Sequence, residues 1–183
     1  MTNFAGILLK AFGWSVECTL PDRPKCIICV APHTSNWDFI LGKLAYSSLR
    51  RKARFLIKEA WFFWPMSCFF KAIGGIPVPK KRGSALTEAI IDEFRHSPEL
   101  TLAITPEGTR SRTDRWRTGF LHIAAGAHVP VYLAAIDYKE KKIILSQQFS
   151  PTGDTEADMR SIKEYYSRFN ARYPEKFSTG TEL

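Results

Sequence analysis

Short apolar runs alternate along this chain with longer segments whose apolar residues recur every three or four positions. Short runs of this kind are typical of buried strands, and they occupy residues 26–32, 54–58, 100–105, 131–136 and 142–149. The wider spacing predicts helices, which we place at residues 4–12, 38–49, 84–94, 119–125 and 155–173. The alternation predicts an α/β fold, a layered sandwich in which helices flank a mixed, mostly parallel sheet. We expect the tail from Pro174 to be frayed.

The length of 183 residues suits one substantial core, so we expect a single domain over residues 1–183. Residues 4–12 place their apolar side chains on one helical face, with Lys10 as the single charge. We therefore predict that residues 1–14 form an amphipathic helix at a membrane surface. A helix packed on the core is the alternative. The segment is too short to cross a bilayer, and it lacks the basic start and the cleavage site of a signal peptide.

Six aromatic residues fall within residues 61–70. This run is also too short for a transmembrane helix, and Pro65 interrupts it. Two interpretations stay open, because so many rings either fill a core or form an apolar surface that faces lipid.

The formal net charge of +8 gathers in two basic clusters, at residues 50–58 and 110–117. A basic surface indicates an anionic partner. The chain shows no zinc-finger spacing, aromatic RNA-binding motif or helix-turn-helix pattern, so we do not expect nucleic acid. Anionic lipid headgroups and phosphorylated substrates both fit the charge.

The four cysteines include a Cys-x-x-Cys pair, Cys26 and Cys29, inside the predicted strand 26–32. Side chains three positions apart on a strand point to opposite faces, so this pair is not suited to one metal ion. No second such pair is present. We expect no metal and small, reduced, buried cysteines, as in a cytosolic protein.

The first candidate for chemistry is the segment from His33 to Asp38, directly after the strand 26–32. On one continuous helix this spacing would separate the two side chains. If residues 34–36 instead fold back, Asp38 can accept a hydrogen bond from the imidazole and leave the other ring nitrogen free as a base. The alternative is a surface histidine beside an aspartate that caps a helix.

A second polar segment, residues 106–112, follows the strand 100–105 in the same way. Its backbone amides around Gly108, the Thr109 hydroxyl and the Arg110 guanidinium are the groups that usually hold phosphate. A mobile charged loop is the alternative. A third segment, residues 74–82, brings a glycine pair into an extended stretch that ends in three cations, and a solvated basic turn is its alternative.

With these motifs in hand, the chain resembles the glycerophospholipid acyltransferase family, whose members acylate glycerol-3-phosphate or lysophosphatidic acid. Four motifs match in the family's order: His33 with Asp38 as the HX4D motif, then Gly75–Val78, Pro106–Arg110 and Val129–Pro130. The second motif departs from the family pattern, because Pro-Lys-Lys-Arg at residues 79–82 replaces the usual aspartate or asparagine and arginine. This departure bears on the identity of the acceptor.

The resemblance implies an O-acyltransferase that moves a fatty acyl group from acyl-CoA or acyl carrier protein to a lysophospholipid, with 1-acyl-sn-glycerol-3-phosphate as acceptor and phosphatidic acid as product. It implies His33 as general base and Asp38 as the group that orients it, with no covalent acyl-enzyme, no metal and no cofactor. The implied substrate-binding residues are Glu107, Gly108, Thr109, Arg110, Gly75, Lys80, Lys81 and Arg82.

The implied location is cytoplasmic, peripheral to the inner face of the membrane. Three alternatives stay open: acylation of another lipid acceptor, hydrolysis of a lipid or thioester by the same His-Asp pair, and membrane binding without catalysis. Thioester consumption that depends on an added lysophospholipid separates them.

Overall fold

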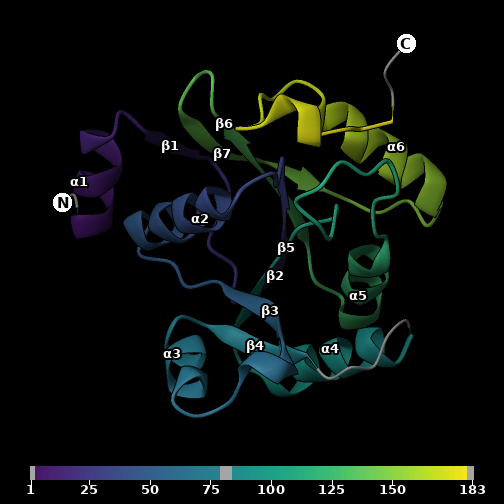
Figure 1. Ribbon diagram of the computed structural model, residues 1–183. Coiled ribbons are helices and arrows are strands. Elements are labelled where there is room, and N and C mark those ends of the chain that lie inside the picture. Colours follow the sequence, from purple (N-terminus) through teal and green to yellow (C-terminus); the bar gives the residue numbers. More distant parts are fainter. Residues whose placement is uncertain (1–2, 79–83, 181–183) are drawn as a thin grey trace.

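The computed structural model describes residues 3–78 and 84–180. Within these residues a single seven-stranded sheet runs in the order β1-β7-β6-β2-β5-β3-β4 (Figure 1). Every neighbouring pair is parallel except β6 and β7. The strands are β1 Ser15–Cys18, β2 Lys25–Ala31, β3 Arg54–Lys58, β4 Gly75–Val78, β5 Leu100–Ile104, β6 Val131–Asp137 and β7 Lys142–Phe149. The predicted α/β fold with a mixed, mostly parallel sheet is confirmed.

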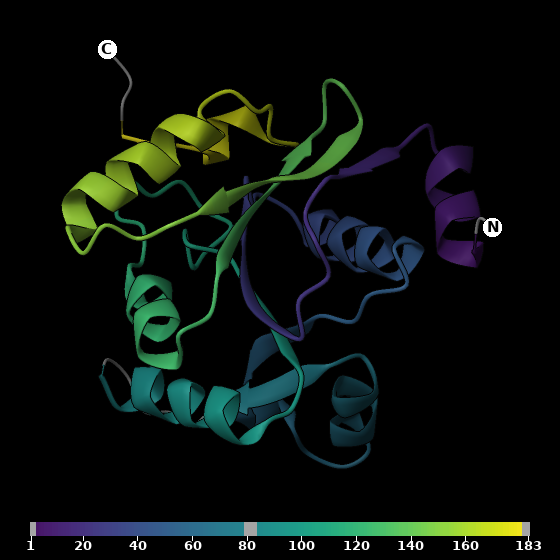
Figure 2. The same ribbon diagram turned by 180° about the vertical axis from the view of Figure 1, so that it is seen from behind.

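Helices cover both faces of the sheet. They are α1 Phe4–Ala11, α2 Asn36–Ser48, α3 Met66–Ala72, α4 Ser84–His96, α5 Gly119–Ala127 and α6 Thr155–Tyr166, with short 3-10 turns η1 Glu59–Trp61 and η2 Pro174–Lys176. One core cluster packs α1 and α2 on the sheet through Leu9, Leu41 and Tyr46. The opposite cluster includes Phe94, Phe120 and Ile162 from α4, α5 and α6, the helices nearest the viewer in Figure 2.

The two central strands are apolar on both faces, which explains their position. All seven residues of β6 are buried, and in β2 Ile27 and Cys29 join one core cluster while Cys26 and Ile28 join the other. Strands covered on both sides read as continuous apolar runs. The prediction that Cys26 and Cys29 point to opposite faces is confirmed.

The sheet order brings three polar segments to one edge. Strands β6, β2 and β5 are parallel neighbours, so their carboxyl ends meet there. His33 follows β2, the segment 106–117 follows β5, and Tyr138 follows β6. Ligands of open α/β sheets bind at this edge.

Two predictions about the C-terminal part were wrong. Helix α6 ends at Tyr166, so the helical pattern does not continue to Tyr173. The tail is not frayed, because Ser178 is buried and its carbonyl accepts a hydrogen bond of 3.0 Å from the indole N–H of Trp116. The chain after α6 therefore packs back along the edge of the sheet that carries the polar segments.

Three elements were not predicted as strands or helices: the short strand β1, the helix α3 within the aromatic run, and β4, whose residues were expected only to be extended. No helix in residues 3–78 or 84–180 combines the length and the apolar character needed to cross a bilayer.

Candidate active site

The turn after β2 folds back on itself, which is one of the two arrangements that the sequence left open. Ser35 is the N-cap of α2, and its hydroxyl accepts from the Trp37 amide while Asp38 closes the capping box from the third helical position. Oδ2 of Asp38 accepts hydrogen bonds of 2.7 Å from the backbone N–H groups of Thr34 and Ser35. These bonds hold the Asp38 carboxylate beneath the turn that carries His33.

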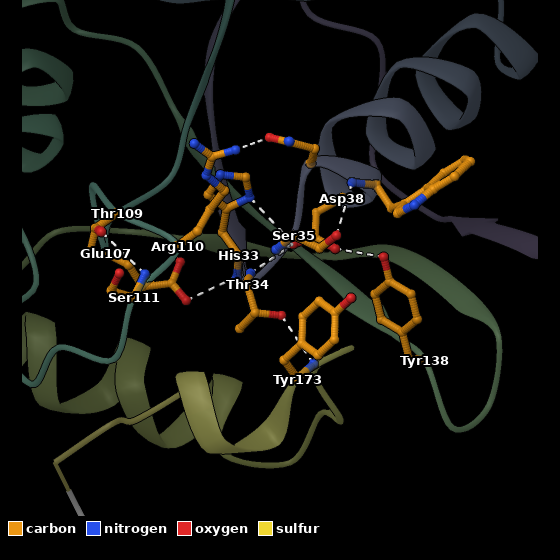
Figure 3. A network of polar contacts seen from close by, with 12 residues as sticks. His33, Thr34, Ser35, Asp38, Glu107, Thr109, Arg110, Ser111, Tyr138 and Tyr173 are labelled. Atoms are coloured by element: carbon orange, nitrogen blue, oxygen red, sulfur yellow. Dashed lines mark hydrogen bonds and ion pairs between the residues drawn. The ribbon is translucent and has the colours of Figure 1, made fainter.

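The two side chains of the HX4D motif face each other (Figure 3). Nδ1 of His33 lies 3.5 Å from Oδ2 of Asp38, whose side chain is 1% exposed, against 19% for His33. Burial by itself raises the pKa of Asp38, but interactions with His33, the Tyr138 hydroxyl and the Ser35 amide together lower it below its usual value. Asp38 is therefore ionised at neutral pH, and it leaves Nε2 of His33 available to the groove.

Glu107 lies on the other side of the same turn. Its Oε1 accepts a hydrogen bond of 2.9 Å from the backbone N–H of His33. The residue is 6% exposed, and among the described residues its Oε2 has no hydrogen-bond partner. Burial, with the nearby charge of Asp38, raises the pKa of Glu107 to about 8 despite the hydrogen bond from His33. The sequence assigned Glu107 to substrate binding, whereas the structure buries this carboxyl against the backbone of His33.

The loop after β5 presents its other polar groups outward. Gly108 has a φ of +64°, and a Cβ at this position would lie 2.5 Å from Nε of Arg117, so the backbone here requires glycine. The Arg110 guanidinium donates to Oδ1 of Asn36, the first residue of α2. The Thr109 hydroxyl accepts from the Ser111 amide at 3.2 Å. Arg110 is thus held beside the helix that carries Asp38.

A groove of about 740 Å³ runs between α2 and the sheet. Polar residues line its mouth, namely His33, Asn36, Thr109, Arg110, Ser111 and Arg117. Apolar residues line its interior, including Ile28, Val30, Phe39, Phe55, Ala134 and Leu145. Lys43 also lines the groove, and its ammonium donates to the Ile73 carbonyl at 2.7 Å while burial lowers its pKa. The site therefore joins a charged opening to an apolar channel.

Gly75 does not belong to this group. It begins β4, at the amino end of a strand parallel to its neighbour and thus away from the edge that holds His33. A Cβ at Gly75 would lie 2.7 Å from Cδ1 of Ile57 and 2.9 Å from the Phe70 carbonyl, so the glycine permits the close packing of α3. The predicted substrate-binding residues Lys80, Lys81 and Arg82 lie outside the described residues.

The sequence did not predict Tyr138, Asn36 and Lys43 as residues of the site. It placed Arg117 in the basic cluster 110–117 without assigning it to the site. The Tyr138 hydroxyl donates to Oδ1 of Asp38 at 2.6 Å (Figure 3). The sequence indicates Tyr138 only through its place in the chain, because it follows a buried strand as His33 does. The described residues contain no group of three or more His, Cys, Asp or Glu side chains placed to hold a metal ion.

The chain is similar to known proteins both in sequence family and in fold. A family model described as Acyltransferase matches residues 17–137. Among solved structures, the fold is similar to the crystal structure of the 1-acyl-sn-glycerophosphate (LPA) acyltransferase PlsC from Thermotoga maritima. That chain shares 20% sequence identity and a TM-score of 0.57, and the match covers 92% of this chain and 79% of that one. No curated protein matches the sequence.

Proposed function

This chain belongs to the acyltransferase family, and we propose that it moves a fatty acyl group from an acyl thioester to the hydroxyl of a lysophospholipid. We take 1-acyl-sn-glycerol-3-phosphate as the acceptor, which gives phosphatidic acid, and acyl-CoA or acyl carrier protein as the donor. The observation that carries the proposal is the position of the His33–Asp38 pair at the polar mouth of a groove that apolar side chains line further in.

His33 acts as the general base. Its Nε2 takes the proton of the acceptor hydroxyl while the hydroxyl oxygen attacks the thioester carbonyl, and the ionised Asp38 stabilises the imidazolium that forms. The new C–O bond forms as the C–S bond breaks, and the imidazolium returns the proton to the departing sulfur. A thiolate leaves readily, since a thiol has a pKa of about 8.5. No covalent acyl-enzyme is required.

The apolar interior of the groove suits the acyl chain. Its lining includes Ile28, Phe39 and Leu145 from β2, α2 and β7. Burial of each methylene contributes about 0.8 kcal/mol, so an acyl chain in the groove would hold the thioester carbonyl at the mouth, beside His33.

Arg110 and Arg117 hold the phosphate of the acceptor. Both are exposed at the groove mouth, and a guanidinium pairs two N–H donors with phosphate oxygens. Gly108 and Thr109 support this role by shaping the loop that carries the arginines. Glu107 contributes indirectly, through the backbone of His33.

The acceptor and product are lipids, and one surface of the protein suits a membrane. We define the apolar face as the exposed side chains of Phe4, Ile7, Phe12, Ile40, Phe63, Trp64 and Phe69. They belong to α1, α2 and the segment through α3, which cover the same side of the sheet (Figure 1). Trp64 is 84% exposed. This face, with the basic character of the chain, supports a peripheral position on the anionic inner face of the membrane.

The test is thiol release from an acyl thioester over a small panel of acceptors. Release that depends on a lysophospholipid supports acyl transfer, and His33→Ala should abolish the dependence. Equal release without any acceptor would identify a thioester hydrolase instead. An absence of turnover with every donor and acceptor would refute the proposed function.

A further inference from the structure

We propose that Tyr138 is a positioning residue of the active site, whose hydroxyl fixes the Asp38 carboxylate and, through it, the orientation and basicity of His33. This inference rests on the proposed function. Tyr138 lies one residue beyond the segment 17–137 that the family model matches.

The first argument is the complete anchoring of Asp38. Its Oδ2 accepts from the two backbone N–H groups of Thr34 and Ser35 and faces Nδ1 of His33. Its Oδ1 accepts the hydrogen bond of 2.6 Å from Tyr138. The terminal torsion of an aspartate is soft, and rotation about it moves both oxygens together. The donor at Oδ1 therefore adds a second restraint that keeps Oδ2 directed at the imidazole.

The second argument is that Tyr138 is itself held in place. Its ring packs edge-on against Trp14, with centroids 5.1 Å apart and planes at 88°. Its backbone N–H donates to the Asn170 carbonyl at 2.9 Å. The Arg172 guanidinium lies 5.9 Å from the ring centroid. The phenol is therefore placed by two separate parts of the chain, Trp14 before β1 and the segment after α6 that carries Asn170 and Arg172.

The third argument concerns the state of the phenol. Burial, together with the hydrogen bond to Asp38 and the charge of that carboxylate, raises the pKa of Tyr138 above its ordinary value. The hydroxyl therefore keeps its proton across the working pH range and serves only as a donor toward Asp38. A phenol that stays protonated always donates its hydrogen bond to Asp38. This bond withdraws negative charge from the carboxylate and weakens the attraction between Asp38 and the His33 imidazole.

The sheet supplies the placement. β6 runs parallel to β2, and Ala135 pairs with Ala31, so the carboxyl ends of both strands are level. The turn after β6 is closed by Asp137, whose Oδ1 accepts from the amides of Lys139 and Glu140 at 2.9 and 3.1 Å. The register of two neighbouring strands and a tight turn thus place Tyr138 beside Asp38. The residues around Tyr138 match no motif in the sequence.

The test is Tyr138→Phe in the full chain, which keeps the ring that packs on Trp14. A displacement of 1 Å at an active site can cost about 10²-fold in rate, and we expect a smaller loosening to lower kcat about tenfold with KM nearly unchanged. The acidic limb of the pH profile of kcat/KM should move to higher pH, because the carboxylate that faces the base keeps more of its charge. The other titratable or charged groups near the His33–Asp38–Tyr138 cluster are Glu107 and Arg110 after β5 and Arg172 beside Tyr138, and they stay in place.

Two further variants separate positioning from simple structural support. In an Asp38→Asn background the Tyr138→Phe change should have almost no effect on kcat, since there is no carboxylate left to orient. Replacement of Tyr138 by 3-fluorotyrosine makes the phenol a stronger donor without changing the fold, and the acidic limb of the pH profile should then move to lower pH. Tyr165→Phe, which removes a buried hydroxyl from the opposite core cluster, is the matched control.

An unchanged pH profile in both Tyr138 variants, or an equal loss of kcat in the Asp38→Asn background, would overturn the inference. Failure of the proposed function gives a different result: the unaltered protein would show no turnover, while the NMR chemical shifts of the His33 ring at one fixed pH would still report whether Tyr138 acts on it.

Discussion

The backbone N–H of His33 donates to Oε1 of Glu107, so one hydrogen bond of 2.9 Å joins two motifs that are 74 residues apart in the chain. The bond leaves Oε2 buried and without a partner among the described residues. A carboxyl group in this environment prefers its neutral form. Ionisation of Glu107 therefore lowers the free energy of unfolding, and it does so only at a pH at which the group ionises.

Replacement of Glu107 by glutamine measures this cost. The pKa of Glu107 is about 8 in the folded protein and about 4.3 in the unfolded chain. Between these two pH values the unfolded chain therefore releases a proton that the folded chain keeps. The free energy of unfolding of the unaltered protein should fall as pH rises through this window, relative to Glu107→Gln, which cannot ionise. Denaturant titrations at pH 5 and pH 8 provide the comparison. A difference between the two proteins that does not change with pH would show that Glu107 ionises normally.

The His33–Asp38 pair should behave as one unit. His33→Ala should lower kcat by about 10²- to 10⁴-fold, the usual contribution of general-base catalysis. The double variant with Asp38→Ala should be scarcely slower, because the second change removes support from a base that is already absent. Circular dichroism is the control for folding, since Asp38 also takes part in the cap of α2. Strictly additive losses in folded proteins would show that the two residues act separately.

Arg110→Ala should chiefly raise KM for a phosphate-bearing acceptor. Hydrogen bonds to charged groups contribute about 1.5–3 kcal/mol, which corresponds to about a 10- to 100-fold change, and phosphate contacts present in the ground state act on KM. Arg115→Ala is the matched control, since it removes the same charge from the same loop at an exposed position that does not line the groove. Similar effects of both variants would point to general charge attraction and away from a specific phosphate contact.

The apolar face should determine vesicle binding. Trp64→Ser, combined with Ile7→Ser, should weaken sedimentation with anionic vesicles, because these side chains are exposed to water in the free protein. Turnover of a detergent-dispersed acceptor should be retained, since neither residue lines the groove. Trp64→Phe keeps an aromatic ring and should bind nearly as well as the unaltered protein. Unchanged binding of the double variant would exclude this face as the membrane contact.

The sequence predicted the features that depend on neighbouring residues. The strands and helices follow from local periodicity, and the approach of His33 and Asp38 follows from a single turn. Strand β1 was missed because its four residues are too few for a clear pattern, and α3 was missed because aromatic residues fill the segment around it.

Features that depend on strand order could not be predicted. The contacts of Glu107 with the His33 backbone and of Tyr138 with Asp38 exist because β5 and β6 flank β2 in the sheet. Nothing in the segments around these residues specifies which strands become neighbours. The position of Gly75 also follows from the sheet, since this residue begins β4 and the amino end of that strand lies away from the edge that holds His33.

The central position of β2 also has a consequence for synthesis of the chain. This strand leaves the ribosome early, but its neighbours β5 and β6 end only at Ile104 and Asp137. Until Ile104 has been made, a strand whose single charged residue is Lys25 has neither of its hydrogen-bonding partners, and until Asp137 it has only one. Pairings of such long sequence separation form slowly. The nascent chain thus exposes an aggregation-prone segment for most of its translation. We expect its yield to depend on chaperones that bind apolar segments, and fragments that end before β6 to be recovered as aggregates.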